Sequence, residues 1–203
     1  MSKYSVIVFD LGNVLIPFDY KKVIDAFNQR KTGLGDKFAK RYQENYNLHR
    51  EFEKGNISLD EFLGTMTEWL EHKVTAEEFC RIFSDIFTRN REVIDLLPKL
   101  KKNYVLCLLS NTNEIHEKYG YNNDGFLKTF DKLFLSHKVG SIKPEEKIYR
   151  TVEEFTGKPS SEHLFIDDVP EYVQGARACG WEAIQFTGYE NLIAELKSCG
   201  IRF

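Results

Sequence analysis

The sequence predicts an α/β fold with a doubly wound, mainly parallel sheet and a small all-helical cap inserted after the first strand. Three observations support it. Short apolar runs recur along the chain, helical stretches separate most of them, and a long helical region follows the first run. Such nearly continuous hydrophobicity is typical of parallel strands covered on both faces. The 203 residues suffice for a core and an insertion.

Five apolar runs are the candidate strands. They occupy residues 5–9, 104–109, 132–135, 163–166 and 182–186. Their alternation with helical segments is the pattern of a doubly wound sheet, similar to a Rossmann fold. We therefore assign residues 1–17 and 99–203 to one α/β core domain.

Residues 18–98, between the first two runs, are predicted to form a helical cap domain. Their periodicity is helical, and they contain no convincing strand. Ser58 with Glu61, and Thr75 with Glu78, have the spacing of capping boxes, which predicts two helix starts. We interpret most aromatic residues of this region as its packing core, although some could line a substrate cleft. They include Phe27, Phe38, Tyr42, Phe52, Phe62 and Trp69.

Composition and charge limit the classes of function. No apolar run approaches the roughly 18 residues of a membrane-spanning helix. The formal net charge of −3, with mixed signs, argues against a nucleic-acid partner. The four cysteines have no paired spacing, and the first residues do not resemble a signal peptide. We expect a cytoplasmic protein, a monomer or weak homodimer, with no membrane or nucleic-acid partner.

Polar residues follow three of the candidate strands directly. Asp10 comes after the first, Ser110 and Asn111 after the second, and Asp167 and Asp168 after the fourth. Each alone could simply open a turn. The carboxyl ends of parallel strands, however, meet at the sheet edge where α/β proteins bind ligands. Two adjacent carboxylates there indicate a hard metal ion, because a cation would offset their charge.

Lys143, before a predicted helix, would by itself be interpreted as surface charge. In their order along the chain, however, the segments around Asp10, Ser110, Lys143 and Asp168 resemble the four sequence motifs of the haloacid dehalogenase superfamily. The resemblance covers residues 4–16 and about 99–203, and the helical insertion matches the position of that superfamily's cap.

The resemblance implies a magnesium-dependent phosphohydrolase that acts on a small phosphorylated metabolite. Asp10 would be the nucleophile and become transiently phosphorylated. Lys143 would neutralise the phosphoryl group and Asp10, while Ser110 and Asn111 would bind the phosphate.

The resemblance also implies a Mg²⁺ site. Its ligands would be Asp10, the backbone carbonyl of Gly12, and Asp168. Asp167 would be a further ligand or a partner of the ligands. The ion would bridge a carboxylate and a phosphate that otherwise repel each other.

Gly12 departs from the superfamily's usual pattern. Most of its phosphatases carry a second aspartate here, as an acid and base that typically contributes about 10²- to 10⁴-fold in rate. The Asp-Leu-Gly-Asn-Val segment is nevertheless similar to bacterial sugar-phosphate phosphatases, including enzymes acting on α-D-glucose 1-phosphate. We therefore expect a sugar-phosphate substrate. One hypothesis for the glycine is a leaving group that is already acidic.

Two other residues are candidate proton donors. They are Glu53, most simply a solvated cap residue, and His116, most simply a packing or surface histidine.

Three alternative functions remain open from the sequence. A phosphotransferase would fit a long-lived phosphoenzyme. A dehalogenase of the same fold needs no metal, so the Asp167–Asp168 pair argues against it. A binding or regulatory module with weakened catalysis would fit Gly12, but it would not require the other site residues.

Overall fold

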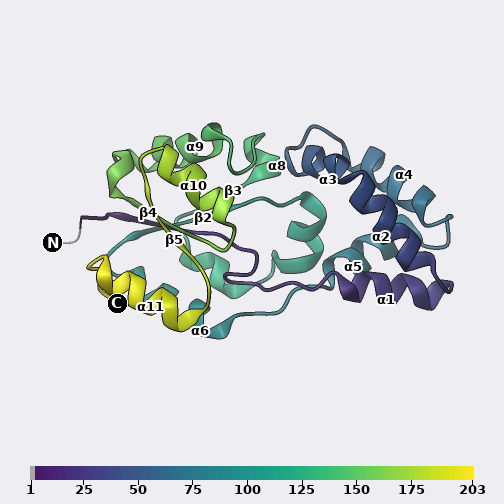
Figure 1. The fold of residues 1–203 in the computed structure, drawn as a ribbon, viewed down its shortest axis with the longest axis horizontal. Helices are drawn as coiled ribbons and strands as arrows, with labels where there is room; N and C mark the ends of the chain where they lie inside the picture. Colours follow the sequence, from purple (N-terminus) through teal and green to yellow (C-terminus); the bar gives the residue numbers. More distant parts are fainter. Residues whose placement is uncertain (1–2) are drawn as a thin grey trace.

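The computed structural model describes residues 3–203 as two lobes, one built on a sheet and one made of helices (Figure 1). The sheet has five strands in the order β3-β2-β1-β4-β5, and all neighbouring strands are parallel. This confirms the predicted fold class, and the strand ends differ from the predicted ones by one residue at most. The strands are β1 (Val6–Phe9), β2 (Val105–Ser110), β3 (Lys132–Leu135), β4 (His163–Asp167) and β5 (Glu182–Gln185).

The strand register brings the predicted site residues to one edge of the sheet. Phe9 at the end of β1 lies opposite Leu108 of β2 and Ile166 of β4. Asp10 and Asp167 follow directly, so the two carboxylates leave adjacent strands at the same level.

Helices cover both faces of the sheet (Figure 1). Val6 and Val8 face the cluster that contains α9 (Glu146–Thr156) and α10 (Pro170–Ala178), whereas Ile7 and Phe9 face the opposite cluster. That second layer consists of α6 (Arg91–Ile94), α7 (Leu97–Leu100) and α11 (Tyr189–Ser198). Because both faces are buried, the strands show no alternation of apolar and polar residues. The remaining short elements are η1 (His116–Tyr121), η2 (Gly125–Thr129), α8 (Ser136–Val139) and η3 (Ser160–Glu162).

The second lobe, which we call the helical cap, has its own aromatic core. Phe52 and Phe62 stack within it, with ring centroids 4.1 Å apart and nearly parallel planes. Thr75 and Glu78 form the predicted reciprocal capping box. The cap consists of α1 (Lys21–Arg30), α2 (Leu34–Glu44), α3 (Tyr46–Glu53), α4 (Leu59–Trp69) and α5 (Ala76–Ser84).

The predicted division into residues 1–17, 18–98 and 99–203 stays a prediction. Val93, Leu96 and Leu97, near the end of the predicted cap range, pack in the hydrophobic cluster of the sheet lobe. Across residues 3–203, no helix combines the length and the apolar character needed to span a bilayer.

Candidate active site

The candidate site centres on three buried charged residues at the carboxyl edge of the sheet. The Lys143 Nζ donates hydrogen bonds to Asp10 Oδ1 at 2.7 Å and to Asp167 Oδ2 at 2.6 Å. Lys143 is only 1% exposed, Asp10 is 6% exposed and Asp167 is fully buried. A buried ammonium is strongly unfavourable without partners, and here two carboxylates surround it. In this ion triad, the lysine charge is therefore stabilised by both carboxylates, and each carboxylate charge is stabilised by the lysine.

The crowded charges shift the pKa values of Asp10 and Lys143. Burial raises the pKa of Asp10 to about 7, against the opposing effect of Lys143. Burial disfavours the charged form of Lys143, but the carboxylates of Asp10 and Asp167 outweigh it and raise the pKa of the lysine. Lys143 thus stays a cation at neutral pH, whereas a second cation beside Asp10 would favour its ionised, nucleophilic form.

The carboxylates of Asp10, Asp167 and Asp168 form a group suited to a metal ion. One oxygen from each lies within 4.8 Å of the others. Asp168 is half-buried, burial raises its pKa, and its Oδ2 accepts a hydrogen bond from Asn13 Nδ2 at 3.0 Å. Carboxylate oxygens are the donors that Mg²⁺ prefers. The donor chemistry of this edge therefore fits the predicted ion.

The two adjacent aspartates differ in how their oxygens are used. Asp167 Oδ2 binds Lys143, and its Oδ1 accepts a hydrogen bond from the Val169 N–H at 2.8 Å. Asp168 has more of its carboxylate free, so it is the better candidate ligand and Asp167 the better partner of the lysine. The Gly12 carbonyl accepts from the Val14 N–H at 2.6 Å and retains a second lone pair.

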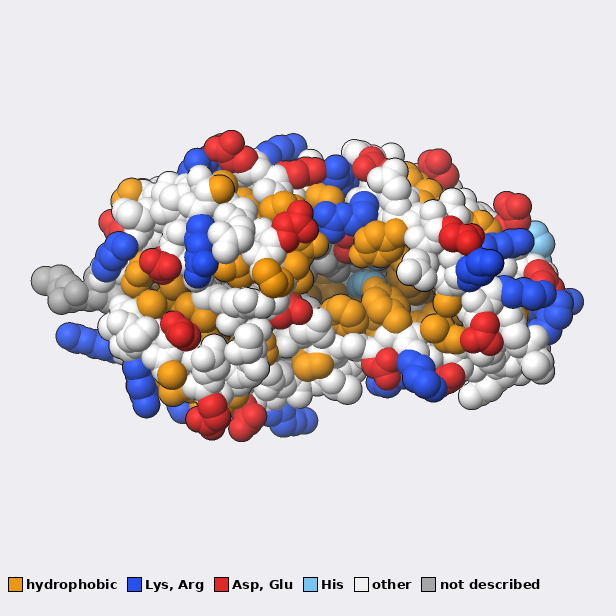
Figure 2. Space-filling model, in the orientation of Figure 1, with side chains coloured by type: hydrophobic (Ala, Val, Ile, Leu, Met, Phe, Trp, Pro, Cys, Tyr) orange, Lys and Arg blue, Asp and Glu red, His pale blue; other side chains and the backbone are white. Residues whose placement is uncertain are grey.

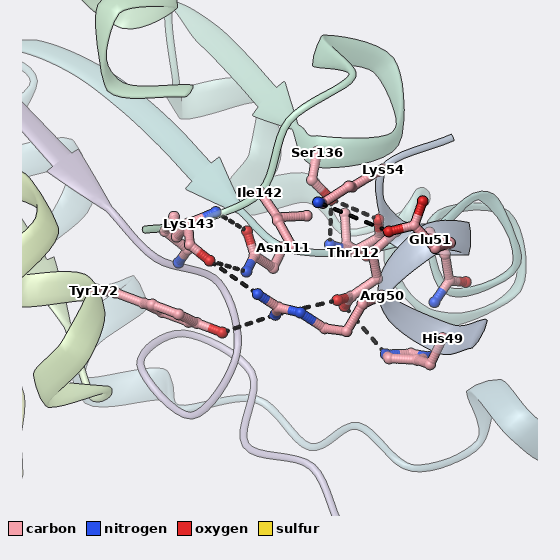
Figure 3. Close-up of polar contacts among 12 residues, drawn as sticks. His49, Arg50, Glu51, Lys54, Asn111, Thr112, Ser136, Ile142, Lys143 and Tyr172 are labelled. Atoms are coloured by element: carbon pink, nitrogen blue, oxygen red, sulfur yellow. Dashed lines mark hydrogen bonds and ion pairs between the residues drawn. The ribbon is translucent and has the colours of Figure 1, made fainter. Parts of the chain in front are cut away.

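Asn111 binds the backbone of Lys143 on both sides (Figure 3). Its Oδ1 accepts from the Lys143 N–H at 2.7 Å, and its Nδ2 donates to the Lys143 carbonyl at 3.1 Å. The Asn111 side chain therefore positions the lysine. Ser110, at the end of β2 and 3% exposed, presents its hydroxyl at the same edge. The predicted contribution of both residues to phosphate binding rests on that hydroxyl and on backbone N–H groups.

A pocket of about 250 Å³ lies over these residues, between the two lobes. Figure 2 shows the hollow from one side, with hydrophobic side chains around it. The sheet lobe contributes Asp10, Lys143 and Asp168 to its wall, and α3 contributes polar residues. The α3 residues are Tyr46, His49, Arg50 and Glu53, and the other Phe and Tyr residues of the lining are Phe18, Tyr20, Phe87, Tyr121 and Tyr172.

Arg50 joins the cap to the sheet lobe beside this pocket (Figure 3). Its Nη1 donates to the Tyr172 hydroxyl at 3.0 Å, and its Nη2 donates to the Lys143 carbonyl at 3.1 Å. Sequence reasoning missed Arg50 and Tyr172 because neither belongs to a motif. The only available signal was the spacing of His49, Arg50 and Glu53, which places three polar residues on neighbouring positions of one helix.

The structure corrects the simplest interpretation of Glu53 and agrees with that of His116. Glu53 is not solvated, because it is 6% exposed and lines the pocket. His116 is buried and stacks on Phe83 with centroids 4.6 Å apart. Burial, assisted by His49, lowers the pKa of His116 to about 3, so its ring is neutral.

The fold and the site together define a class of enzyme with a carboxylate, a lysine and an adjacent pair of aspartates at the edge of a parallel sheet. A family model described as haloacid dehalogenase-like hydrolase matches residues 4–180. The D-ribitol-5-phosphate phosphatase of Bacteroides thetaiotaomicron is 30% identical over 188 residues, which are 88% of this chain and 90% of that protein. The chain belongs to the haloacid dehalogenase-like hydrolases.

Solved structures support the same assignment. A family enzyme from B. thetaiotaomicron, bt-2542, was crystallised as a wild-type complex with magnesium and inorganic phosphate. It has a TM-score of 0.77 and 28% identity, with 90% of this chain and 93% of that chain covered. A predicted family hydrolase of Porphyromonas gingivalis has a TM-score of 0.78 and 27% identity, with 97% of this chain and 98% of that chain covered. The predicted superfamily and hydrolase class are confirmed, and the magnesium complex agrees with the predicted Mg²⁺ cofactor.

Proposed function

We propose that the protein is a Mg²⁺-dependent phosphatase that hydrolyses sugar or polyol phosphates through an aspartyl-phosphate on Asp10. The observation that carries this proposal is the buried contact of Lys143 with both Asp10 and Asp167. It sets a fixed cation against the candidate nucleophile, which is the arrangement that attack on an anionic phosphate requires. The D-ribitol-5-phosphate phosphatase, which is similar to this chain over 90% of its own length, supports sugar or polyol phosphates as the substrate class.

In this proposal, the residues at the sheet edge share the charge of the transferring phosphoryl group. Asp10 attacks phosphorus in line with the leaving oxygen, and Lys143 offsets charge on the phosphoryl oxygens. The Ser110 hydroxyl and adjacent N–H groups hold the phosphate. Mg²⁺, bound by Asp10, Asp168 and the Gly12 carbonyl, would offset the repulsion between carboxylate and phosphate.

The pocket favours a small leaving group. Its volume of about 250 Å³ must hold a phosphate together with the group attached to it. The polar residues Arg50, Glu53 and His116 in its wall offer partners for hydroxyl groups, as a sugar or polyol requires.

Phosphate release from purified protein tests the proposal. We expect Mg²⁺-dependent hydrolysis of D-ribitol 5-phosphate or another sugar phosphate in a panel that also contains nucleotides, acyl phosphates and a halo acid. Asp10→Asn should abolish release and prevent acid-stable labelling of the protein by ³²P-substrate. Release that persists in Asp10→Asn would exclude Asp10 as nucleophile, and no turnover on any substrate would favour a binding module.

The other predictions about cellular context remain proposals. We propose a cytoplasmic location, which the four cysteines support because all are free thiols in the structure. A monomer or weak homodimer without nucleic-acid or membrane partners stays the expected state. A phosphotransferase activity would appear in the same assay as turnover that depends on an added alcohol acceptor.

A further inference from the structure

Gly12 places no acidic side chain two residues after the candidate nucleophile, and an aromatic ring limits the space there. A Cβ built on Gly12 would meet Phe18 Cε1 at 3.0 Å and Asp10 Oδ2 at 3.9 Å. Phe18 in turn contacts Tyr20 and Phe87 edge-on, with centroids 5.4 Å and 6.4 Å away. A side chain that protonates the leaving group would therefore have to stand elsewhere in the pocket wall.

Glu53 on α3 lies in the pocket wall and has a carboxylate oxygen that accepts no hydrogen bond. It is 94% buried, since 6% of it is exposed, and it lines the same pocket as Asp10. Within residues 3–203, its Oε2 has no hydrogen-bond partner. A buried carboxylate oxygen without a hydrogen bond is unfavourable in a folded protein, and Arg50 Nη1, at 3.7 Å, is beyond hydrogen-bond distance. A ligand in the pocket would supply the missing partner.

The other oxygen of Glu53 belongs to a chain of proton-carrying groups. Oε1 lies 3.2 Å from His49 Nε2, and His49 Nδ1 lies 2.5 Å from the Tyr42 hydroxyl. His49 is 4% exposed, so the imidazole is shielded from bulk water. This arrangement holds the Glu53 carboxyl in a fixed position against the imidazole.

Arg50 connects the helix of Glu53 to the backbone of the phosphoryl site. The Arg50 guanidinium binds the carbonyl of Lys143, whose ammonium binds Asp10. Glu53 is three residues further along α3, and its Oε2 is 3.7 Å from Arg50 Nη1. Residues three apart lie on one helix face, so the contact that docks α3 on the site also turns Glu53 toward it.

We propose that Glu53 is the general acid and base of the reaction, with His49 as its positioning residue. This inference rests on the proposed phosphatase function and deepens it. As the bond from Asp10 to phosphorus forms, the bond to the leaving oxygen breaks, its electron pair stays on that oxygen, and the oxygen takes the proton of the Glu53 carboxyl. A water then attacks phosphorus and gives its proton to the Glu53 carboxylate, and the electron pair of the Asp10–phosphorus bond returns to Asp10.

A series of aryl phosphates tests this role. Its members differ in the acidity of the leaving group, and none adds a hydroxyl group that could bind the pocket wall. Phenyl phosphate and p-nitrophenyl phosphate are the end members, and kcat/KM reports the step that breaks the bond to the leaving oxygen. Loss of a proton donor typically lowers the rate by about 10²- to 10⁴-fold. In Glu53→Gln we expect kcat/KM to fall about 10²-fold for phenyl phosphate and less than about 10-fold for p-nitrophenyl phosphate.

Controls separate this role from a structural one. Glu51→Gln alters a carboxylate of the same helix that is not in the pocket wall, and it should leave the leaving-group dependence unchanged. His49→Gln should steepen the dependence in the same direction as Glu53→Gln, which keeps the test open if one variant folds poorly.

The proposal would be overturned if plots of log(kcat/KM) against leaving-group pKa were parallel for wild type and folded Glu53→Gln. A steep wild-type plot that Glu53→Gln does not change would instead support the hypothesis of an acidic natural leaving group. Failure of the proposed function would give a different result. The wild-type protein would then show no Mg²⁺-dependent phosphate release, or its release would persist in Asp10→Asn.

Discussion

The Asn111 side chain binds Lys143 by both its amide oxygen and its amide nitrogen, at 2.7 Å and 3.1 Å. The Lys143 carbonyl also accepts the hydrogen bond from Arg50. One short segment of backbone therefore connects the end of β2, the cap and the candidate nucleophile. Small errors in the position of Lys143 should have large effects on the reaction, since catalysis by a fixed charge depends on geometry.

Asn111→Ala should lower kcat while leaving the protein folded. It removes both hydrogen bonds to the Lys143 backbone, and a displacement of about 1 Å can cost on the order of 10²-fold in rate. Steady-state phosphate release at saturating Mg²⁺ measures the effect. Asn56→Ala, on the exposed surface of the cap, is the matched control. An unchanged kcat would show that Asn111 is not needed to position the lysine.

Asp167 and Asp168 should respond differently to substitution by asparagine. Asp168→Asn removes charge from a candidate Mg²⁺ ligand, so the Mg²⁺ concentration for half-maximal activity should rise at least about 10-fold. Asp167→Asn removes an ion-pair partner of Lys143, so kcat should fall with a smaller change in Mg²⁺ requirement. Titrations of activity with Mg²⁺ compare the two variants. The reverse pattern would make Asp167 the metal ligand.

The sequence predicted the sheet and most of its edge for a physical reason. Buried parallel strands leave near-continuous apolar runs, and residues such as Asp10 and Asp168 that follow them must meet at one edge. Lys143 was recognisable only by its order among the motifs, because a single lysine before a helix usually carries surface charge.

The cap wall of the site was not predictable in the same way. Helical periodicity shows that α3 has an apolar face, but His49, Arg50 and Glu53 line the pocket because of how the cap docks on the sheet lobe. That docking depends on contacts over long sequence separations, such as Arg50 with Tyr172. Glu53 consequently looked like a solvated residue, although it is buried beside a histidine.

His116 should make the protein less stable as the pH falls. Its pKa is lowered to about 3 in the folded protein by burial, whereas an unfolded histidine has a pKa of about 6.5. Between these values the unfolded state binds more protons, so the free energy of unfolding falls with acidification by up to about 1.4 kcal/mol per pH unit. The contribution is complete above pH 6.5 and is lost progressively below it.

Urea unfolding between about pH 5 and pH 7 measures this dependence around the unfolded histidine pKa. His116→Gln should flatten the slope in that window, whatever its effect on absolute stability. His72→Gln, at an exposed position, should keep the wild-type slope. Equal slopes for wild type and His116→Gln would mean that His116 does not stay neutral in the folded protein.

Arg50 and Tyr172 should be energetically coupled, because their contact joins the two lobes beside the pocket. Tyr172→Phe removes the acceptor hydroxyl, and Arg50→Lys removes the planar group that reaches both that hydroxyl and the Lys143 carbonyl. If both residues act by docking α3, each variant should raise KM several-fold. The double variant should then be little worse than Arg50→Lys, because its second change removes a contact already lost. Additive effects on log(kcat/KM) would show that Arg50 acts mainly through Lys143 or the substrate rather than through Tyr172.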